Sequence, residues 1–417
     1  MKKSIRPVPL LLALLMIMSL PGCRNAETGG MTQQEETEAL SRSETTATEP
    51  AVTEAPTEEP TTEEATEAPI TISLVSIGDM LMHSPVSWKA EAENWDYSYV
   101  YEHVKDKVEA ADLAIVNNEV IIGGNEKGNQ NYPCFNVRTE LGDCEVATGF
   151  DVMLSASNHT MDQGIDSLLY CANFWEENYP DITVVGIHST EEDAKEIEVR
   201  DVNGIKIALL NYTYGLNGYS LPEGYEWACD LMTDETKDKI ADDIARAKEL
   251  SDFVIVFPHW GEEYVLTQNA EQEAWAMFFA EQGVDLVIGT HPHVLEPVEW
   301  ITAENGNRML CYYSLGNFIS TQPYFYTMLG GMSEVSITKD ATGTYISDYA
   351  IKLTVTHYSM SCLDITTYFV EDYTDELAAG HYWSYGVDDW HNDGISFTVE
   401  GLKQLGESIC PGIVDYD

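Results

Sequence analysis

The 417-residue sequence predicts an α/β fold in which a mixed or parallel sheet is covered by helices. From residue 70 onward, short β-rich apolar runs alternate with amphipathic helical patterns, and no internal repeat is visible. Five of the apolar runs also end directly in Asp, Glu, Asn or His. Since the carboxyl ends of buried strands are the edge at which α/β sheets build their sites, this pattern predicts one convergent functional site.

The first 23 residues have the features of a secretory signal. Basic residues precede an apolar stretch at 10–20 that is too short to span a bilayer. The ending Leu20-Pro21-Gly22-Cys23 resembles a bacterial lipobox, which would make Cys23 the lipidated first residue of the mature protein. Simple secretion, with Cys23 as an ordinary residue, is the alternative. The lipidated form would be anchored at the extracellular face of the bacterial cell membrane.

Residues 24–69 are Thr, Glu, Ala and Pro with hardly any large apolar side chain. Such a segment cannot bury enough surface to offset the entropy lost on ordering, and its like charges repel one another. We expect a disordered, extended stalk between the anchor and the folded domain.

The folded part is expected to begin at residue 70. Apolar, β-branched runs predict strands, in order, at residues 70–77, 113–116, 152–156, 182–187, 205–212, 253–257, 285–289 and 309–314. Apolar residues at helical spacing predict helices at residues 97–111, 165–179, 237–251 and 270–283. After about residue 331 the sequence alternates as antiparallel strands do, with one short helix at 399–408. No linker precedes it, so we expect 70–330 as the main domain and 331–417 as its β-rich extension.

The formal net charge of −50 argues against nucleic acid as a partner, because phosphate backbones require a positive surface. The same charge opposes the approach of any polyanionic substrate. The eight cysteines include no C-x-x-C pair, which disfavours a zinc ribbon or a thioredoxin-type redox site. A disulfide remains open, with Cys134 and Cys144 the nearest pair in the folded part.

The polar residues at the five strand ends are those that bind metal ions. The apolar runs lead into Asp79, Glu119, Asn158, His159, His259, His291 and His293. Each alone has a structural alternative: Gly78-Asp79 is also a common turn, and an isolated His is more often a satisfied core residue. Chance would not place all of them at strand ends, so together they predict a pair of divalent metal ions.

The residue types narrow the metal and the chemistry. A mixed shell of His, Asp, Glu and Asn suits Mn, Zn or Fe better than Ca or Mg, which prefer oxygen alone. Two such ions polarise a phosphoryl or acyl oxygen and activate water. Next to the ligand Asn158, His159 can donate a proton, while Asp162 orients its ring.

The order of these motifs resembles one family. GD, NNE, SNHxxDxG, HWGEEY, GxHPHVLxPVE and YSLGNF follow one another over residues 72–320, as in the CapA family of bacterial poly-γ-glutamate capsule synthesis proteins. The resemblance implies a metallophosphoesterase-like (calcineurin-like) sandwich of mixed β-sheets flanked by helices. It also implies a dinuclear site with Glu119 as the bridging ligand and His159 as the proton donor. The implied ligands are Asp79, Glu119, Asn158, His259, His291 and His293.

The sequence departs from phosphoesterases of the wider fold at two motifs. The usual Asp-x-His is replaced by Asp79 followed by MLMH, so His83 is a candidate to supply the missing imidazole from a displaced position. Glu119 stands where the second motif usually has Asp. The signature at 314–318 (SLGNF) reveals no chemical role, and a turn packing beneath the site is the structural interpretation.

Three functions fit these features. The first is a surface-anchored metal-dependent hydrolase of phosphoesterase-like fold that acts on an anionic polymer or its precursors. The second is a non-catalytic capsule-assembly subunit that uses the metal fold to bind polymer or membrane proteins of capsule synthesis. The third, a solute-binding lipoprotein, does not require five ligand motifs. Fold analogy does not decide between the first two.

Overall fold

The computed structural model describes residues 68–322, 324–385 and 395–416. The predicted signal segment with Cys23, and the predicted stalk up to residue 67, lie outside these residues. Among the described residues, no helix combines the length and apolar character needed to cross a bilayer. The cysteines in this part of the chain are all free thiols.

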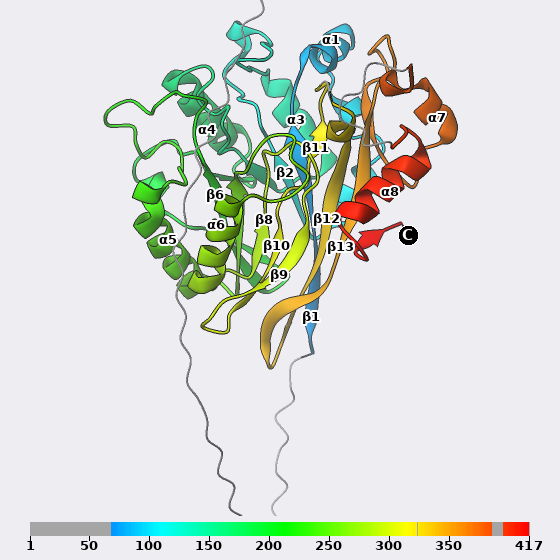
Figure 1. Cartoon of the computed structure of the whole chain (residues 1–417). Coiled ribbons are helices and arrows are strands. Elements are labelled where there is room, and N and C mark those ends of the chain that lie inside the picture. The colour runs from blue at the N-terminus through cyan, green and yellow to red at the C-terminus, as the bar shows by residue number, and fades with distance from the viewer. Residues whose placement is uncertain (1–67, 323, 386–394, 417) are drawn as a thin grey trace, which may run out of the picture. The chain divides into compact units, whose positions relative to one another are not determined.

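Two β-sheets form the framework of the described residues (Figure 1). The first contains, in spatial order, β14 (Thr366–Phe369), β13 (Gly343–His357), β12 (Leu329–Asp340), β1 (Ile70–Met80), β2 (Leu113–Asn117), β3 (Val152–Leu154) and β4 (Thr183–Val185). Two short strands, β11 (Asn317–Ile319) and β15 (Val414–Asp415), pair with β1 and β13. The second contains β5 (Glu198–Val202), β6 (Ile205–Thr213), β7 (Phe253–His259), β8 (Leu286–Ile288), β10 (Arg308–Tyr312) and β9 (Val298–Thr302).

The second sheet has parallel strands in its middle and an antiparallel strand at each side, whereas the first sheet is parallel from β1 to its edge strand β4 and antiparallel on the other side of β1. Strands β1 to β4 are parallel to one another, as are β6, β7, β8 and β10. Antiparallel β12 joins β1, and antiparallel β5 and β9 form the sides of the second sheet. Both sheets are therefore mixed, as predicted.

Helices cover the sheets and connect their strands. They are α1 (Ser84–Ala92), α2 (Lys105–Ala110), α3 (Thr139–Thr148), α4 (Ile165–Asn178), α5 (Lys237–Leu250), α6 (Ala270–Gln282), α7 (Asp375–Gly380) and α8 (Val399–Ile409).

The start of helix α6 is fixed by side-chain hydrogen bonds to its first turn. The Asn269 side chain accepts hydrogen bonds from the first-turn N–H groups of Glu271 and Gln272, and the Gln272 side chain accepts one from Asn269 in return. With these features, the predicted α/β class with helix-flanked mixed sheets is confirmed.

Strand β7 of the second sheet is buried on both faces, and its successive side chains point to opposite sides of the sheet. In β7, Phe253, Ile255 and Phe257 belong to the core shared with the first sheet. Val254 and Val256, between them, belong to a second core with the apolar faces of α5 and α6. This explains why β7 reads as a continuous apolar run rather than an alternating one.

The predicted helix at 97–111 is shorter in the structure. A 3₁₀ turn at Ser98–Val100 comes first, and the α-helix covers only Lys105–Ala110. The Tyr99 hydroxyl donates to the Val86 carbonyl at 2.6 Å, and the Tyr101 hydroxyl donates to Glu145. Aromatic residues form helices weakly, and here their buried hydroxyls take partners outside the segment.

The C-terminal segment adds strands to the first sheet. Strand β12 pairs antiparallel with β1 along most of its length and turns at 341–342 into β13, which returns beside it (Figure 1). Helix α8, predicted at 399–408, packs Leu402, Leu405 and Ile409 into the main core.

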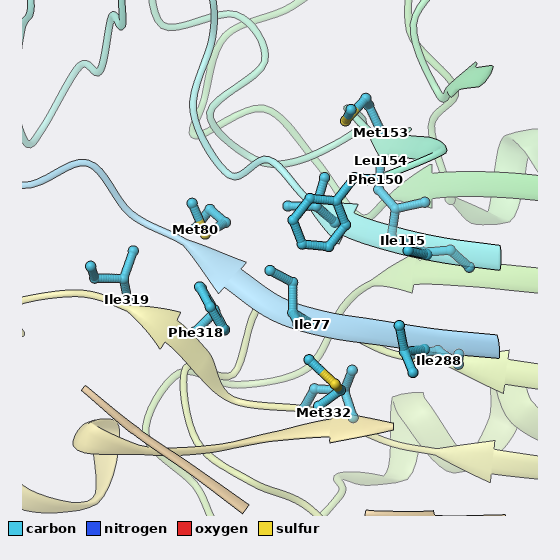
Figure 2. Close-up of a cluster of buried hydrophobic side chains, with 14 of the residues drawn as sticks. Ile77, Met80, Ile115, Phe150, Met153, Leu154, Ile288, Phe318, Ile319 and Met332 are labelled. Carbon is cyan, nitrogen blue, oxygen red and sulfur yellow. The ribbon is translucent and has the colours of Figure 1, made fainter. Parts of the chain in front are cut away.

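Apolar side chains pack around the carboxyl end of β1. Figure 2 shows Ile77 and Met80 of β1 beside Ile115 of β2, Phe318 of β11 and Met332 of β12, all of them buried. These contacts hold the strand ends in fixed positions, and the polar residues that follow are therefore positioned by a close-packed core.

Backbones come into close contact at the same place. A Cβ on Gly78 would lie 1.9 Å from the carbonyl oxygen of Gly316. The backbone N–H of Asp79 donates to that same carbonyl at 2.9 Å. Only glycine permits this approach, which explains the Gly-Asp pair that the sequence presents at the end of β1.

Candidate metal centre

The predicted ligands come together at the carboxyl ends of strands from both sheets. Asp79 lies at the end of β1, Glu119 follows β2, and Asn158 follows β3. His259 is the last residue of β7, and the 291–293 turn follows β8. All of these side chains are buried. The convergence follows from parallel pairing, which brings the ends of neighbouring strands to one edge.

Glu119 lies at the middle of this group. Its side chain is fully buried, and neither carboxylate oxygen has a hydrogen-bond partner among the described residues. Burying a carboxylate without partners is strongly unfavourable unless a positive charge compensates it. The two oxygens face two different sets of donor atoms.

The first donor group contains Asp79, Glu119 and His293. Nδ1 of His293 lies 3.0 Å from Oδ2 of Asp79 and 3.6 Å from Oε2 of Glu119. Atoms that bind one ion at about 2.0–2.2 Å lie roughly this far from one another.

The second donor group contains Glu119, His259 and His291. Oε1 of Glu119 lies 3.5 Å from Nε2 of His259 and 3.9 Å from Nδ1 of His291. The Asn158 side-chain oxygen lies 3.0 Å from the same His259 nitrogen. Glu119 thus directs one oxygen toward each group.

The His-Pro-His turn has a strained backbone. His291 has φ 99° and His293 has φ 61°, in a region that residues other than glycine seldom occupy. The His291 N–H donates to Oδ1 of Asp79 at 3.1 Å, which helps to hold this conformation. Strain of this kind persists where surrounding contacts fix it, and it is concentrated at functional sites.

Two further polar residues orient the ligands. Nδ1 of His259 lies 2.9 Å from the Thr290 hydroxyl, which leaves Nε2 directed toward Glu119 and Asn158. The Asn117 side-chain N–H donates to Oδ1 of Asp79 at 2.9 Å, so Oδ2 remains for His293. Partners of this kind fix ring and carboxylate orientation in metal sites.

Burial and the two carboxylates shift the pKa values of the site in opposite directions. Burial raises the pKa of Glu119. Burial also acts to raise the pKa of Asp79, but the hydrogen bond and charge of His293 outweigh it and lower that pKa. For His293, burial is outweighed by Glu119 and Asp79, which raise its pKa to about 9. Burial lowers the pKa of His259 to about 3 and that of His291 to about 4, so both imidazoles are neutral before any metal binds, whereas His293 must release a proton to become a ligand.

The predicted proton donor lies beside the second donor group. Nδ1 of His159 lies 2.7 Å from Oδ2 of Asp162, which also accepts the N–H of Phe135. The Phe135 ring packs edge-on against the imidazole at 4.8 Å. Asp162 and Phe135 therefore fix the orientation of the His159 ring, as the sequence predicts for Asp162.

His83, the candidate for a displaced imidazole, lies outside both donor groups. Its Nδ1 lies 3.3 Å from the Thr321 N–H, and its ring packs against Phe135.

Glu263, which was not among the predicted ligands, forms a further possible group with His291 and His293, and its side chain is exposed. The HWGEEY motif contains it, but nothing in the sequence distinguishes it from Glu262.

The structure of the 314–318 segment also differs from the turn that the sequence predicted. Part of it forms the short strand β11 rather than only a turn beneath the site. Asn317 pairs in register with Asp79, and its side-chain oxygen lies 3.1 Å from Nδ1 of His293. Sequence reasoning assigned this residue no chemical role.

A loop that follows β6 of the second sheet contacts Asn158 and His159. Asn217 on this loop accepts from the Asn158 amide at 3.2 Å, and its own amide lies 3.4 Å from Nδ1 of His159. Farther along, Asp230 anchors the loop through His188 at 2.9 Å.

Together these observations fit metal ions at this site. Glu119 has two buried oxygens without hydrogen bonds, and Nδ1 of His291 also lacks a partner among the described residues. Atoms that are left unpaired in a buried polar cluster are those that a bound cation would satisfy.

Comparison with known proteins agrees with the family resemblance. The model of the family described as bacterial capsule synthesis protein PGA_cap matches residues 73–322. The chain belongs to this family. Its relatives include the PGA biosynthesis protein CapA of Bacillus subtilis, which is 28% identical to it over 66% of this chain and 70% of that protein. The capsule biosynthesis protein CapA of Bacillus anthracis is 27% identical over 61% of each chain. The CapA resemblance is confirmed.

Solved structures that are similar include a phosphatase from Mycoplasma pneumoniae, with 17% identity, a TM-score of 0.42, and coverage of 69% of this chain and 94% of that one. The calcineurin-like phosphoesterase YfkN from Bacillus subtilis has 13% identity and a TM-score of 0.37, with coverage of 69% and 91%. At these scores the similarity carries no argument about the reaction.

If each donor group binds an ion, changing either histidine of the turn should weaken the binding of one ion. His293 belongs to the first donor group and His291 to the second, so His293→Ala and His291→Ala should each weaken binding of one ion by about 10- to 100-fold or more. Elemental analysis after equilibrium dialysis against Mn²⁺ or Zn²⁺ measures this. His381→Ala is a matched control, because His381 is a buried histidine that contacts the Thr356 carbonyl instead. Full metal content in the His293 variant would contradict the two-ion arrangement.

The loop anchor predicts a pH-dependent component of stability. Burial acts to lower the pKa of His188, but hydrogen bonds to Asp193 and Asp230 outweigh it and raise that pKa from 6.5 to about 9. The charged imidazole therefore stabilises the fold fully below pH 6.5, and this stabilisation is lost as pH rises through about 9. The difference in Tm between the wild type and His188→Gln should shrink over that interval. A difference that stays constant with pH would exclude a charged His188.

Proposed function

We propose that this protein is a metal-dependent hydrolase of the capsule synthesis family, acting on an anionic polymer or on its phosphorylated or amide-linked precursors. The observation that carries the proposal is Glu119, whose two buried oxygens each face a separate group of metal-binding side chains. A purely structural role does not explain a buried carboxylate with neither oxygen hydrogen-bonded.

The residues that would hold the ions fall into two groups. Asp79, Glu119 and His293 would hold one, and Glu119, Asn158, His259 and His291 would hold the other. Mn, Zn or Fe suits this mixture of oxygen and nitrogen donors. When bound, two such ions polarise a phosphoryl or acyl oxygen and make water a stronger nucleophile.

His159 would supply the proton that the leaving group needs. Its Nδ1 is paired with Asp162 at 2.7 Å, so Nε2 is the ring nitrogen available for exchange with a substrate. Asp162 holds the imidazole in this tautomer and stabilises its charged form. Asn217 contacts both His159 and Asn158, and it would hold the donor at a fixed position relative to the second ion.

The proposed substrate is poly-γ-glutamate or one of its precursors. The curated relatives are named for PGA and capsule biosynthesis. Because the chain carries a formal net charge of −50, a free polyanion would be repelled at long range. We therefore infer that membrane proteins of capsule synthesis deliver the polymer to this site.

Delivery of this kind fits a protein held at the membrane. The lipobox-like ending at Cys23 and the acidic stalk after it support attachment at the extracellular face of the bacterial cell membrane. The stalk would separate the catalytic domain from the bilayer while allowing it to reach membrane partners.

His159→Ala should separate catalysis from metal binding. The variant should keep its metal content and lose about 10²–10⁴-fold in hydrolytic rate, since a general acid is removed and no ligand is. The measurement is hydrolysis of a chromogenic phosphodiester and of a γ-glutamyl peptide by the purified chain, alongside elemental analysis. His83→Ala is the control, because this neighbouring imidazole lies outside both donor groups, and it should keep both rate and metal.

Two results would contradict the hydrolase. One is an unchanged rate in His159→Ala when the wild type is active. The other is normal capsule production in cells that express metal-free variants, which would support the alternative of a non-catalytic assembly subunit.

The anchor has its own test. Cys23→Ser should move the protein from the membrane fraction to the medium and remove the mass of the lipid, since only a cysteine accepts it. Fractionation and mass spectrometry of the full chain measure this. Unchanged retention and mass would exclude the lipoprotein and leave Cys23 as an ordinary residue of a secreted chain.

A further inference from the structure

The first donor group has fewer protein donors than the second. Asp79, Glu119 and His293 form it, whereas Asn158 adds a fourth donor to the second group. His83, the one imidazole near the first motif that could complete it, contacts the Thr321 N–H instead.

Asn317 lies where a fourth donor would be needed. Its side-chain oxygen is 3.1 Å from Nδ1 of His293, the same atom that lies 3.0 Å from Asp79. The residue is 1% exposed. Its position is set by the backbone, because β11 pairs with the end of β1 and Asn317 is opposite Asp79 in the register.

The orientation of the Asn317 amide is determined by its neighbours. The NH₂ group lies 3.1 Å from the Thr327 carbonyl, 2.8 Å from the Ser320 hydroxyl and 2.7 Å from Oε1 of Gln322. A carbonyl can only accept a hydrogen bond, so the nitrogen must face Thr327 and the oxygen must face His293. The protein thus directs a buried amide oxygen into the donor group.

The second group contains an asparagine amide that is oriented in the same way. The Asn158 oxygen lies 3.0 Å from Nε2 of His259, while its NH₂ group donates to Asn217. In both amides the nitrogen is held by other residues and the oxygen faces an imidazole nitrogen of the site. Asn317 therefore corresponds to Asn158 in the opposite group.

We propose that Asn317 is the fourth protein ligand of the first ion and that it replaces the imidazole missing from the first motif. This rests on the proposed two-ion site. The first group then offers three oxygens and one nitrogen, and the second offers two oxygens and two nitrogens. Oxygen donors suit Mn²⁺, and imidazoles suit Zn²⁺, so the first site prefers Mn²⁺ relative to the second.

Metal binding by Asn317 variants tests this without reference to activity. Purified full-length wild type, Asn317→Ala, Asn317→Asp and Asn317→His are titrated with Mn²⁺ and with Zn²⁺, and stoichiometry is measured by elemental analysis. Asn317→Ala should lose about 10- to 100-fold or more in affinity for one ion and keep the other. Asn317→Asp, which retains an oxygen, should keep both. Asn317→His should shift the first site toward Zn²⁺.

Asn136→Ala is the matched control. Asn136 is a fully buried asparagine whose amide donates to the carbonyls of Gly124 and Gly128. Its loss therefore disturbs packing without removing an atom of either metal-binding group. It should bind both ions with wild-type affinity.

The outcomes separate this inference from the proposed function. A wild type that binds fewer than two ions would overturn the two-ion site itself. Two ions bound equally well by wild type and Asn317→Ala would leave that site standing and exclude Asn317 as a ligand. Weakened binding in Asn317→Ala with an unchanged Mn²⁺-to-Zn²⁺ preference in Asn317→His would also overturn it, because it would show that Asn317 only orients His293.

Discussion

The buried carboxylate of Glu119 is the feature on which the arrangement of the site depends. It follows the interior strand β2 of the first sheet, and water does not reach either oxygen. A negative charge in this position is costly unless a positive charge lies close to it, and the surrounding elements bring metal-binding side chains to it. His293 approaches from one side, and His259 and His291 approach from the other. The strand ends and the turn therefore form one polar environment around this carboxylate.

Much of the fold and the site could be predicted because their signals are local. An apolar run that ends in a polar residue identifies both a strand and its carboxyl end, and five such runs led to Asp79, Glu119, Asn158, His259 and the 291–293 turn. In parallel pairing the carboxyl ends of neighbouring strands lie at one edge of the sheet. The fold class alone was therefore enough to predict that these residues come together. The same local signals placed α8 within a residue of its observed end.

Other features depend on contacts that the local sequence does not contain. Asn317 reaches the site because β11 pairs with β1, and its amide is oriented by Gln322 and the Thr327 carbonyl. In SLGNF, by contrast, nothing indicates which strand it will join. The segment at 97–111 has a helical pattern, but its tyrosines bond to distant partners, and tertiary packing overrides the local preference.

The pairing of β1 with β12 has a consequence for where the protein can be divided. The family segment ends at residue 322, yet β12 at Leu329–Asp340 supplies the hydrogen-bonding partner along most of one side of β1. A fragment cut at the family boundary would turn β1 from a central strand into an open edge. Exposed edges of that length invite pairing with other chains, so the fragment would tend to aggregate. The smallest stable unit is consequently larger than the segment by which the family is recognised.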